Sequence, residues 1–136
     1  MARIDYLTSK LASKVKLPEE FFDEIMGPPV YAFFTPQEVE YIRKMMLRNR
    51  NDVKIKELNN IMRSRGFARL SGGTNRIVYR HLEDPSFVMK VAIDRVGMND
   101  SNREFKNQQF LKPYVCKIFD STPCGTMSTV ERVYPI

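Results

Sequence analysis

The spacing of apolar residues changes from helix-like to strand-like near Gly66, and this change constrains the fold more than any other feature. Up to that point apolar residues recur every three or four positions, which is the spacing of one helix face. After it, short runs rich in β-branched and aromatic residues are separated by glycine or by an Asp-Pro corner. The sequence therefore predicts two parts, a helical segment over 1–66 and a β-sheet subdomain over 67–136.

Start and stop signals delimit the helices of the first part. Apolar spacing predicts one helix over 1–15 and a shorter one over 18–27, which begins at a proline followed by two glutamates. Thr35 and Glu38 form a capping box, because the threonine oxygen can accept a hydrogen bond from a free amide while the glutamate reaches back. A last helix is expected over 52–66, where the final glycine can supply a left-handed ending.

The second part should form a five-stranded antiparallel sheet with one helix. The strands are expected over 67–70, 77–80, 87–93, 114–119 and 126–133. Between the third and fourth strands, "NDSNREFKNQQFL" returns to helical spacing, with Asp100 or Ser101 as the cap. The predicted fold class is therefore α+β, a helical N-terminal segment plus this sheet.

The chain is basic, which favours acidic partners and leaves both nucleic acid and nucleotide phosphate open. It has 22 Lys and Arg against 16 Asp and Glu, a formal charge of +6 and a pI near 9.4. A basic run in the helical segment could bind a phosphate backbone, although a solvated helix face is the commoner meaning of such a run. No aromatic residue lies between Tyr41 and Phe67, which counts against single-strand recognition. The candidate nucleic-acid residues are Arg43, Lys44, Arg48, Arg50, Lys54 and Lys56.

Other residue types narrow the function classes. Cys116 and Cys124 are the only cysteines and flank a turn, so we expect reduced thiols instead of a disulfide framework. His81 is the only histidine, which excludes a histidine-based metal cluster, and we expect it at the surface. No apolar run approaches the ~18 residues of a membrane span. We therefore expect a soluble cytoplasmic protein with no membrane partner.

A glycine turn followed by a lysine-bearing strand supplies the residue types of an anion-binding hairpin. Gly72 and Gly73 allow backbone amides to approach a phosphate, and Val78 can cover a base. Lys90 interrupts an otherwise apolar strand, and a half-buried ammonium needs an anionic partner. Glu104, on the following helix, is the candidate partner, so we expect these two residues to form an ion pair. Taken alone, each feature has an ordinary reading as a tight turn, a snorkelling lysine or a solvated glutamate.

The glycine turn, Val78, the lysine strand and the helix with Glu104 follow one another along the chain. With this order of features, residues from about 70 to 135 resemble the amino-terminal lobe of the protein-kinase-like fold, including the small kinase-like proteins of bacteria and their phages. "SGGTNRIV" resembles the glycine-rich loop and "VMKVA" resembles the lysine strand. The glutamate of "NREFKNQQ" resembles the helix-C glutamate, and "VERV" resembles the gatekeeper and hinge, where the main chain would meet the adenine edge. The resemblance implies ATP binding through Gly72, Gly73, Val78, Lys90, Glu104, Glu131 and Val133.

The sequence departs from the kinase pattern in two respects. Ser71 and Arg76 replace the outer glycines of the loop, and Arg76 could itself supply charge. The sequence ends at Ile136, shortly after the hinge, with nothing that resembles the catalytic loop or the metal-binding Asp-Phe-Gly. We therefore expect nucleotide binding without phosphotransfer by this chain alone, either beside a C-terminal lobe beyond Ile136 or as a natural half. The alternative is a non-enzymatic interaction module that binds nucleic acid or a host protein through its basic helical face.

Overall fold

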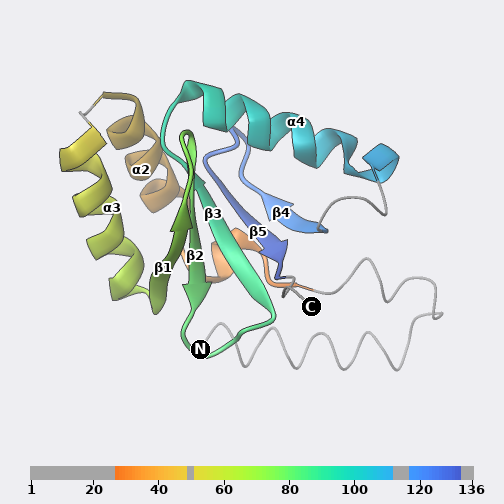
Figure 1. Cartoon of the computed structure of the whole chain (residues 1–136), viewed down its shortest axis with the longest axis horizontal. Helices are drawn as coiled ribbons and strands as arrows, with labels where there is room; N and C mark the ends of the chain where they lie inside the picture. The colour runs from red at the N-terminus through yellow and green to blue at the C-terminus, as the bar shows by residue number, and fades with distance from the viewer. Residues whose placement is uncertain (1–26, 49–50, 112–116, 133–136) are drawn as a thin grey trace.

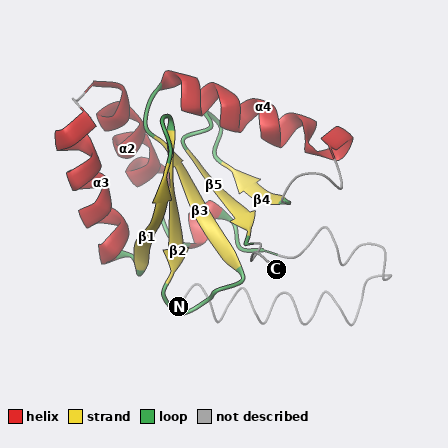
Figure 2. Ribbon diagram, in the orientation of Figure 1, coloured by secondary structure: helices red, strands yellow, loops and turns green. Residues whose placement is uncertain are grey.

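The structure, a computed structural model, describes residues 27–48, 51–111 and 117–132. The helical segment contains η2 (Val30–Ala32), α2 (Pro36–Arg48) and α3 (Asn51–Ser64). The sheet segment contains β1 (Phe67–Gly72), β2 (Arg76–His81), β3 (Phe87–Ala92), α4 (Arg95–Leu111), β4 (Ile118–Ser121) and β5 (Met127–Glu131) (Figure 2). The predicted α+β class is confirmed. The helices predicted over 1–15 and 18–27 lie outside the described residues, except for position 27.

The five strands form one antiparallel sheet in the order β1-β2-β3-β5-β4. Helix α4 follows β3, lies across one end of the strands and contacts β3 and β4 (Figure 1). β5 returns between β3 and β4, which leaves β1 and β4 at the two edges. The register places Val78, Lys90 and Ser128 beside one another on three neighbouring strands.

One face of the sheet packs on the N-terminal helices. Every second residue of β2 is buried, which is the pattern of a strand with one covered face. This face shares a single hydrophobic core with α2 and α3, so the helical segment and the sheet stabilise each other. The largest fully buried side chains include Phe34, Ile42, Met46, Leu58, Met62, Phe67, Ile77, Tyr79, Phe87, Met89 and Met127.

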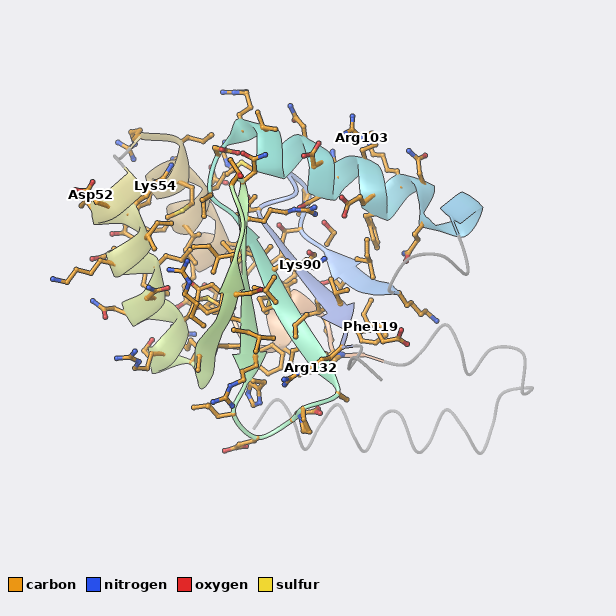
Figure 3. All side chains as sticks on the ribbon, in the orientation of Figure 1. Asp52, Lys54, Lys90, Arg103, Phe119 and Arg132 are labelled. Carbon is orange, nitrogen blue, oxygen red and sulfur yellow. The ribbon has the colours of Figure 1, made fainter. Side chains whose placement is uncertain are left out.

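The opposite face of the sheet is partly exposed along β2 and at Lys90, whereas its residues on the rest of β3 and on β5 are buried. Arg76, Val78 and Arg80 alternate with the buried residues of β2 and are partly exposed. Lys90 is the one partly exposed residue of β3. Because paired residues of antiparallel strands point to the same side, Lys90 shares this face with Val78, below α4 (Figure 3).

Two of the predicted helix signals are confirmed. The Thr35 N–H donates to Glu38 Oε1 (2.8 Å), and the Glu38 N–H donates to Thr35 Oγ1 (3.1 Å), so a capping box starts α2. Gly66 has a φ of 86°, which is the left-handed ending expected after the helix that precedes β1. In the part of the chain that the structure describes, no helix is both long and apolar enough to cross a bilayer.

Helix α4 begins earlier than predicted, and its cap is a different residue. The Gly97 N–H donates to Asp94 Oδ1 (2.8 Å), so Asp94 caps the helix and the prediction of Asp100 or Ser101 is wrong. The early start brings the first turn of α4 against the β1–β2 turn. A Cβ on Gly97 would lie only 2.2 Å from the Asn75 carbonyl oxygen, so glycine permits this close approach.

Candidate functional site

The β1–β2 turn is fixed in place by backbone hydrogen bonds. Within the turn, the Gly73 N–H donates to the Arg76 carbonyl (2.8 Å). The Asn75 carbonyl accepts a hydrogen bond from the Ile93 N–H (2.9 Å), which ties the turn to the chain that follows β3. The turn therefore has a defined position beside the start of α4.

The predicted roles of the two glycines in this turn can be tested against their surroundings. A Cβ on Gly73 would meet its nearest atom, the Arg76 carbonyl oxygen, at 3.6 Å, which is ordinary contact. A Cβ on Gly72 would meet only the far end of the flexible Arg69 side chain, at 2.3 Å. Neither glycine has a left-handed backbone conformation. The turn itself therefore does not require glycine at either position, and the Gly73 amide is already hydrogen-bonded.

A cavity of about 370 Å³ opens between this turn, the lysine strand and α4. Its wall is mainly polar, with one apolar side chain from β2. It brings together Gly73, Val78 and Lys90, three of the residues predicted to bind a nucleotide. The lining residues are Gly73, Thr74, Asn75, Arg76, Val78, Lys90 and Asp100.

The predicted ion pair between Lys90 and Glu104 is wrong. Glu104 instead binds Arg76 through two hydrogen bonds, Nη1 to Oε1 at 2.8 Å and Nη2 to Oε2 at 3.0 Å. Two parallel hydrogen bonds to one carboxylate fit the planar guanidinium of arginine better than the ammonium of lysine, which explains why Glu104 pairs with Arg76 and not with Lys90. No described residue forms an ion pair with Lys90 within 4 Å, although the positive charge of Lys90 helps to lower the pKa of Glu104.

The environment of the Arg76–Glu104 pair keeps both groups ionised. Desolvation raises the pKa of the Glu104 carboxyl. The hydrogen bond and charge of Arg76, together with the charges of Lys90 and Arg103, lower the pKa by more than desolvation raises it. The resulting pKa is below the ordinary 4.5 of a glutamate. The hydrogen bond from Glu104 raises the pKa of Arg76, against the effect of burial. Glu104 therefore carries a full negative charge at neutral pH.

Four lining residues were not among the predicted nucleotide-binding set, namely Thr74, Asn75, Arg76 and Asp100. Arg76 precedes Val78 by two positions in a strand, so alternation alone would place both on one face. Asp100 precedes Glu104 by four positions in α4, so helical spacing would place both on one side. Asp100 also forms an ion pair with Arg103. Thr74 and Asn75 give no comparable signal, because turn geometry brings them to the cavity.

The predicted hinge lies away from this cavity. Glu131 is three residues beyond Ser128 on β5, roughly 10 Å along the strand. Its N–H donates to the Lys117 carbonyl (2.8 Å), so this amide is already used within the sheet. Val133, the other predicted hinge residue, lies outside the described residues.

The candidate nucleic-acid residues do not form one uniform basic surface. Lys54 is only 4% exposed, and its Nζ donates to the carbonyls of Met46 (2.8 Å) and Ile93 (2.5 Å), so this nucleic-acid candidate does not belong to an exposed basic helical face. Arg43 is partly buried and pairs with Glu40 on its own helix. The exposed members are Lys44, Arg48 and Lys56, while Arg50 lies outside the described residues.

The only histidine is also placed differently from the prediction. His81 is 8% exposed, and its Nδ1 accepts the N–H groups of Glu83 and Asp84, both at 3.2 Å. Its ring lies 4.9 Å from that of Phe67 and 5.7 Å from that of Phe87, measured between centroids. It belongs to the aromatic core, and the prediction of a surface histidine is wrong. Across the described ranges, no group of three or more His, Cys, Asp and Glu side chains could hold a metal ion.

We compared the chain with protein-family models, with curated proteins and with solved structures, and none of the three comparisons gave a significant match.

Proposed function

We propose that this cavity binds the phosphate groups of a nucleotide, with ATP as the first candidate, and that the chain is the nucleotide-binding lobe of a kinase-like protein. The observation that carries the proposal is the position of Lys90. This lysine lines a 370 Å³ cavity beside the β1–β2 turn, and none of the described carboxylates pairs with it. A half-buried ammonium without a protein counter-ion favours an anionic ligand.

The charges around the cavity support an anion. Arg76 is balanced by Glu104, and the carboxylate of Asp100 is balanced by Arg103. Lys90 is left as the uncompensated charge among these five groups, which gives the cavity a net positive charge of about one. A phosphate oxygen would supply the missing partner through a charge-assisted hydrogen bond.

The order of the elements supports a kinase-like lobe. The glycine turn, the lysine strand, the helix with Glu104 and the last strand pair follow one another as the sequence resemblance implies. Val78 lies in the row of Lys90 and is the apolar member of the cavity wall, where a base or ribose could pack. β5 then leads from Ser128, beside Lys90, toward Glu131. An adenine edge would have to use acceptors or donors other than the Glu131 amide, since that amide is already engaged.

The proposal includes no phosphotransfer by these 136 residues alone. Phosphoryl transfer in kinases needs magnesium ligands and a residue that positions the nucleophile. Neither the catalytic loop nor the metal-binding motif has a counterpart among residues 1–136. The chain would therefore hold ATP without transferring its phosphate, and a single lobe should bind weakly, with a Kd of ~1 mM.

Equilibrium binding of ATP to purified Lys90→Gln and Lys106→Gln variants tests the proposal. Lys106 is an exposed lysine of α4 that does not line the cavity, so it controls for the loss of one positive charge. Lys90→Gln should weaken ATP binding about tenfold or more, since a hydrogen bond to a charged group contributes roughly 1.5–3 kcal/mol. Equal affinities in the two variants would refute the proposal.

A second candidate function rests on the exposed basic residues of the helices. Lys44 and Arg48 lie on the outside of α2 with exposed Tyr41, and none of these basic residues pairs with a described carboxylate. Binding to a nucleic-acid backbone would fall with salt, by roughly 0.9 unit of log-log slope per phosphate neutralised. Titration of a labelled duplex at two salt concentrations tests this candidate. Absence of binding at low salt would leave these side chains as a solvated face.

A further inference from the structure

We infer that Arg76, acting through its side chain, is the second phosphate-binding residue of this cavity and takes the part that backbone amides of the glycine turn would otherwise have. The inference rests on the proposed function, because it names how the same cavity holds its anion. Arg76 lines the cavity, whereas its partner Glu104 does not. The guanidinium is bound by Glu104 and lies close enough to Asp100, another lining residue, to interact with its charge.

The register of the sheet brings Arg76 and Lys90 to one place. Arg76 pairs with Ala92 in the β2–β3 ladder, and Lys90 precedes Ala92 by two residues. The two basic residues are thus diagonal neighbours on one face, with Cα atoms roughly 7–8 Å apart. Long side chains from such positions can reach one phosphate group between them.

The hydrogen bonds that Arg76 already makes leave donors for a phosphate. Glu104 uses one N–H on Nη1 and one on Nη2. A guanidinium has five N–H donors, so three remain available after this fork. An incoming phosphate can therefore share Arg76 with Glu104 or displace the carboxylate.

The turn, in contrast, offers little to an anion at its central glycine. The Gly73 N–H is bonded to the Arg76 carbonyl at 2.8 Å. A methyl group at Gly73 would fit without a clash, since its nearest neighbour would be 3.6 Å away. The Gly73 amide is therefore already used within the turn, and we assign recognition of the phosphate to the side chains of Arg76 and Lys90.

The test compares ATP affinity in three variants, Arg76→Gln, Glu104→Gln and Arg80→Gln. The first two break the same ion pair, but only Arg76→Gln removes the cation that we assign to phosphate binding. Arg80 lies on the same strand and the same face, roughly 13 Å farther along, and does not line the cavity. It controls for the general charge of this surface, which salt screens over such a distance.

We expect Arg76→Gln to weaken ATP binding about tenfold, because one or two charge-assisted hydrogen bonds are lost. Arg80→Gln should change the affinity by less than about twofold, since a screened charge at that distance contributes little. Glu104→Gln should leave ATP binding as tight as in the unmodified chain or tighten it, because a carboxylate that competes for Arg76 is removed. Arg76→Lys keeps the charge but not the fork, and should give an intermediate affinity.

Three outcomes overturn the inference. Equal weakening by Arg76→Gln and Glu104→Gln would mean that the ion pair only supports the structure. Equal affinities of the Arg76→Gln and Arg80→Gln variants for ATP would mean that Arg76 does not contact the anion. If Lys90→Gln still weakens ATP binding strongly in the same series, the proposed function holds and only the inference about Arg76 fails. If the unmodified chain binds no ATP, both the inference and the proposed function fail. Thermal melts of each variant show which ones are folded, and Arg76→Lys replaces Arg76→Gln in the comparison if the latter unfolds.

Discussion

Replacing Lys54 with methionine should lower the free energy of unfolding by about 3 kcal/mol. The same change at an exposed lysine of the same helix should leave this free energy almost unchanged. The Lys54 ammonium lies between α3 and α2 and joins two carbonyl groups, those of Met46 and Ile93 (Figure 3). Met46 is among the last residues of α2, whose carbonyls have no partner within the helix. Ile93 lies between β3 and α4. One side chain thus ties the helical segment to the sheet segment.

The magnitude follows from the two hydrogen bonds that are lost. Each hydrogen bond to a charged group contributes roughly 1.5–3 kcal/mol, or about 3–6 kcal/mol together. Methionine has a similar length and removes the cost of burying a charge, which offsets part of this loss. Two buried carbonyls remain without a partner, so a net loss of about 3 kcal/mol is expected.

Urea denaturation followed by circular dichroism measures this difference. Lys56→Met is the matched control, since Lys56 is an exposed residue of α3, and it should change the unfolding free energy by less than about 0.5 kcal/mol. Unchanged m-values would show that the variants unfold to comparable ensembles. If Lys54→Met and Lys56→Met have the same stability, the Lys54 side chain does not hold the helical segment to the sheet segment.

Three further predictions concern the turn, the core and the ion pair. Gly97→Ala should destabilise the fold by about 1–2 kcal/mol, because its Cβ would meet the Asn75 oxygen at 2.2 Å. Gly73→Ala should leave the stability almost unchanged, because its Cβ would meet no atom closer than 3.6 Å. Thermal denaturation of the two variants measures the difference. Burial raises the pKa of the Tyr79 phenol, whose hydroxyl donates to Asn59 Oδ1 (2.6 Å), so Tyr79→Phe should cost about 1 kcal/mol at neutral pH. Because the unfolded phenol ionises first, this tyrosine lowers stability as pH rises above ~10, and the Phe variant should lack that loss in alkaline urea titrations. The pKa of Glu104 is lower in the folded chain than the ordinary 4.5, so its ionised form stabilises the fold above pH 4.5. This stabilisation is lost as the pH falls through the folded pKa. In a plot of unfolding free energy against pH, Arg76→Gln should therefore reduce the loss on the acid side by less than about 1 kcal/mol.

Much of the fold could be predicted from local patterns. The observed ends of β1, β2, β3 and β5 lie within two residues of the expected ones, because alternation and turn residues mark strands directly. The capping box at Thr35 and the ending at Gly66 were equally readable, since each depends on residues adjacent in sequence. The start of α4 was not, because the sequence offers several residues able to cap and tertiary contact selects Asp94.

The candidate site was only partly predictable, since its chemistry depends on which side chains meet. The positions of Gly73, Val78 and Lys90 around one cavity agree with the order of motifs along the chain. The partner of Glu104 could not be read from sequence, because both Arg76 and Lys90 lie on the sheet face near α4 and geometry decides between them. Lys54 was misread for a similar reason. A lysine on a basic helix is usually exposed, and only the packing of α2 against α3 shows that this one is buried.

The central claim, that the cavity beside the β1–β2 turn binds a nucleotide phosphate, is tested most directly by mapping ATP onto the amide resonances of the chain. The largest chemical-shift changes should fall on the turn residues Gly73 and Thr74 and on Arg76, Val78 and Lys90, with half-saturation at ~1 mM ATP. Adenosine without phosphates should produce much smaller changes at these positions, because no anion would reach the two basic side chains. Shifts confined to the exposed faces of α2 and α3, or no shifts at millimolar ATP, would contradict the account and leave the β1–β2 hairpin as a purely structural element.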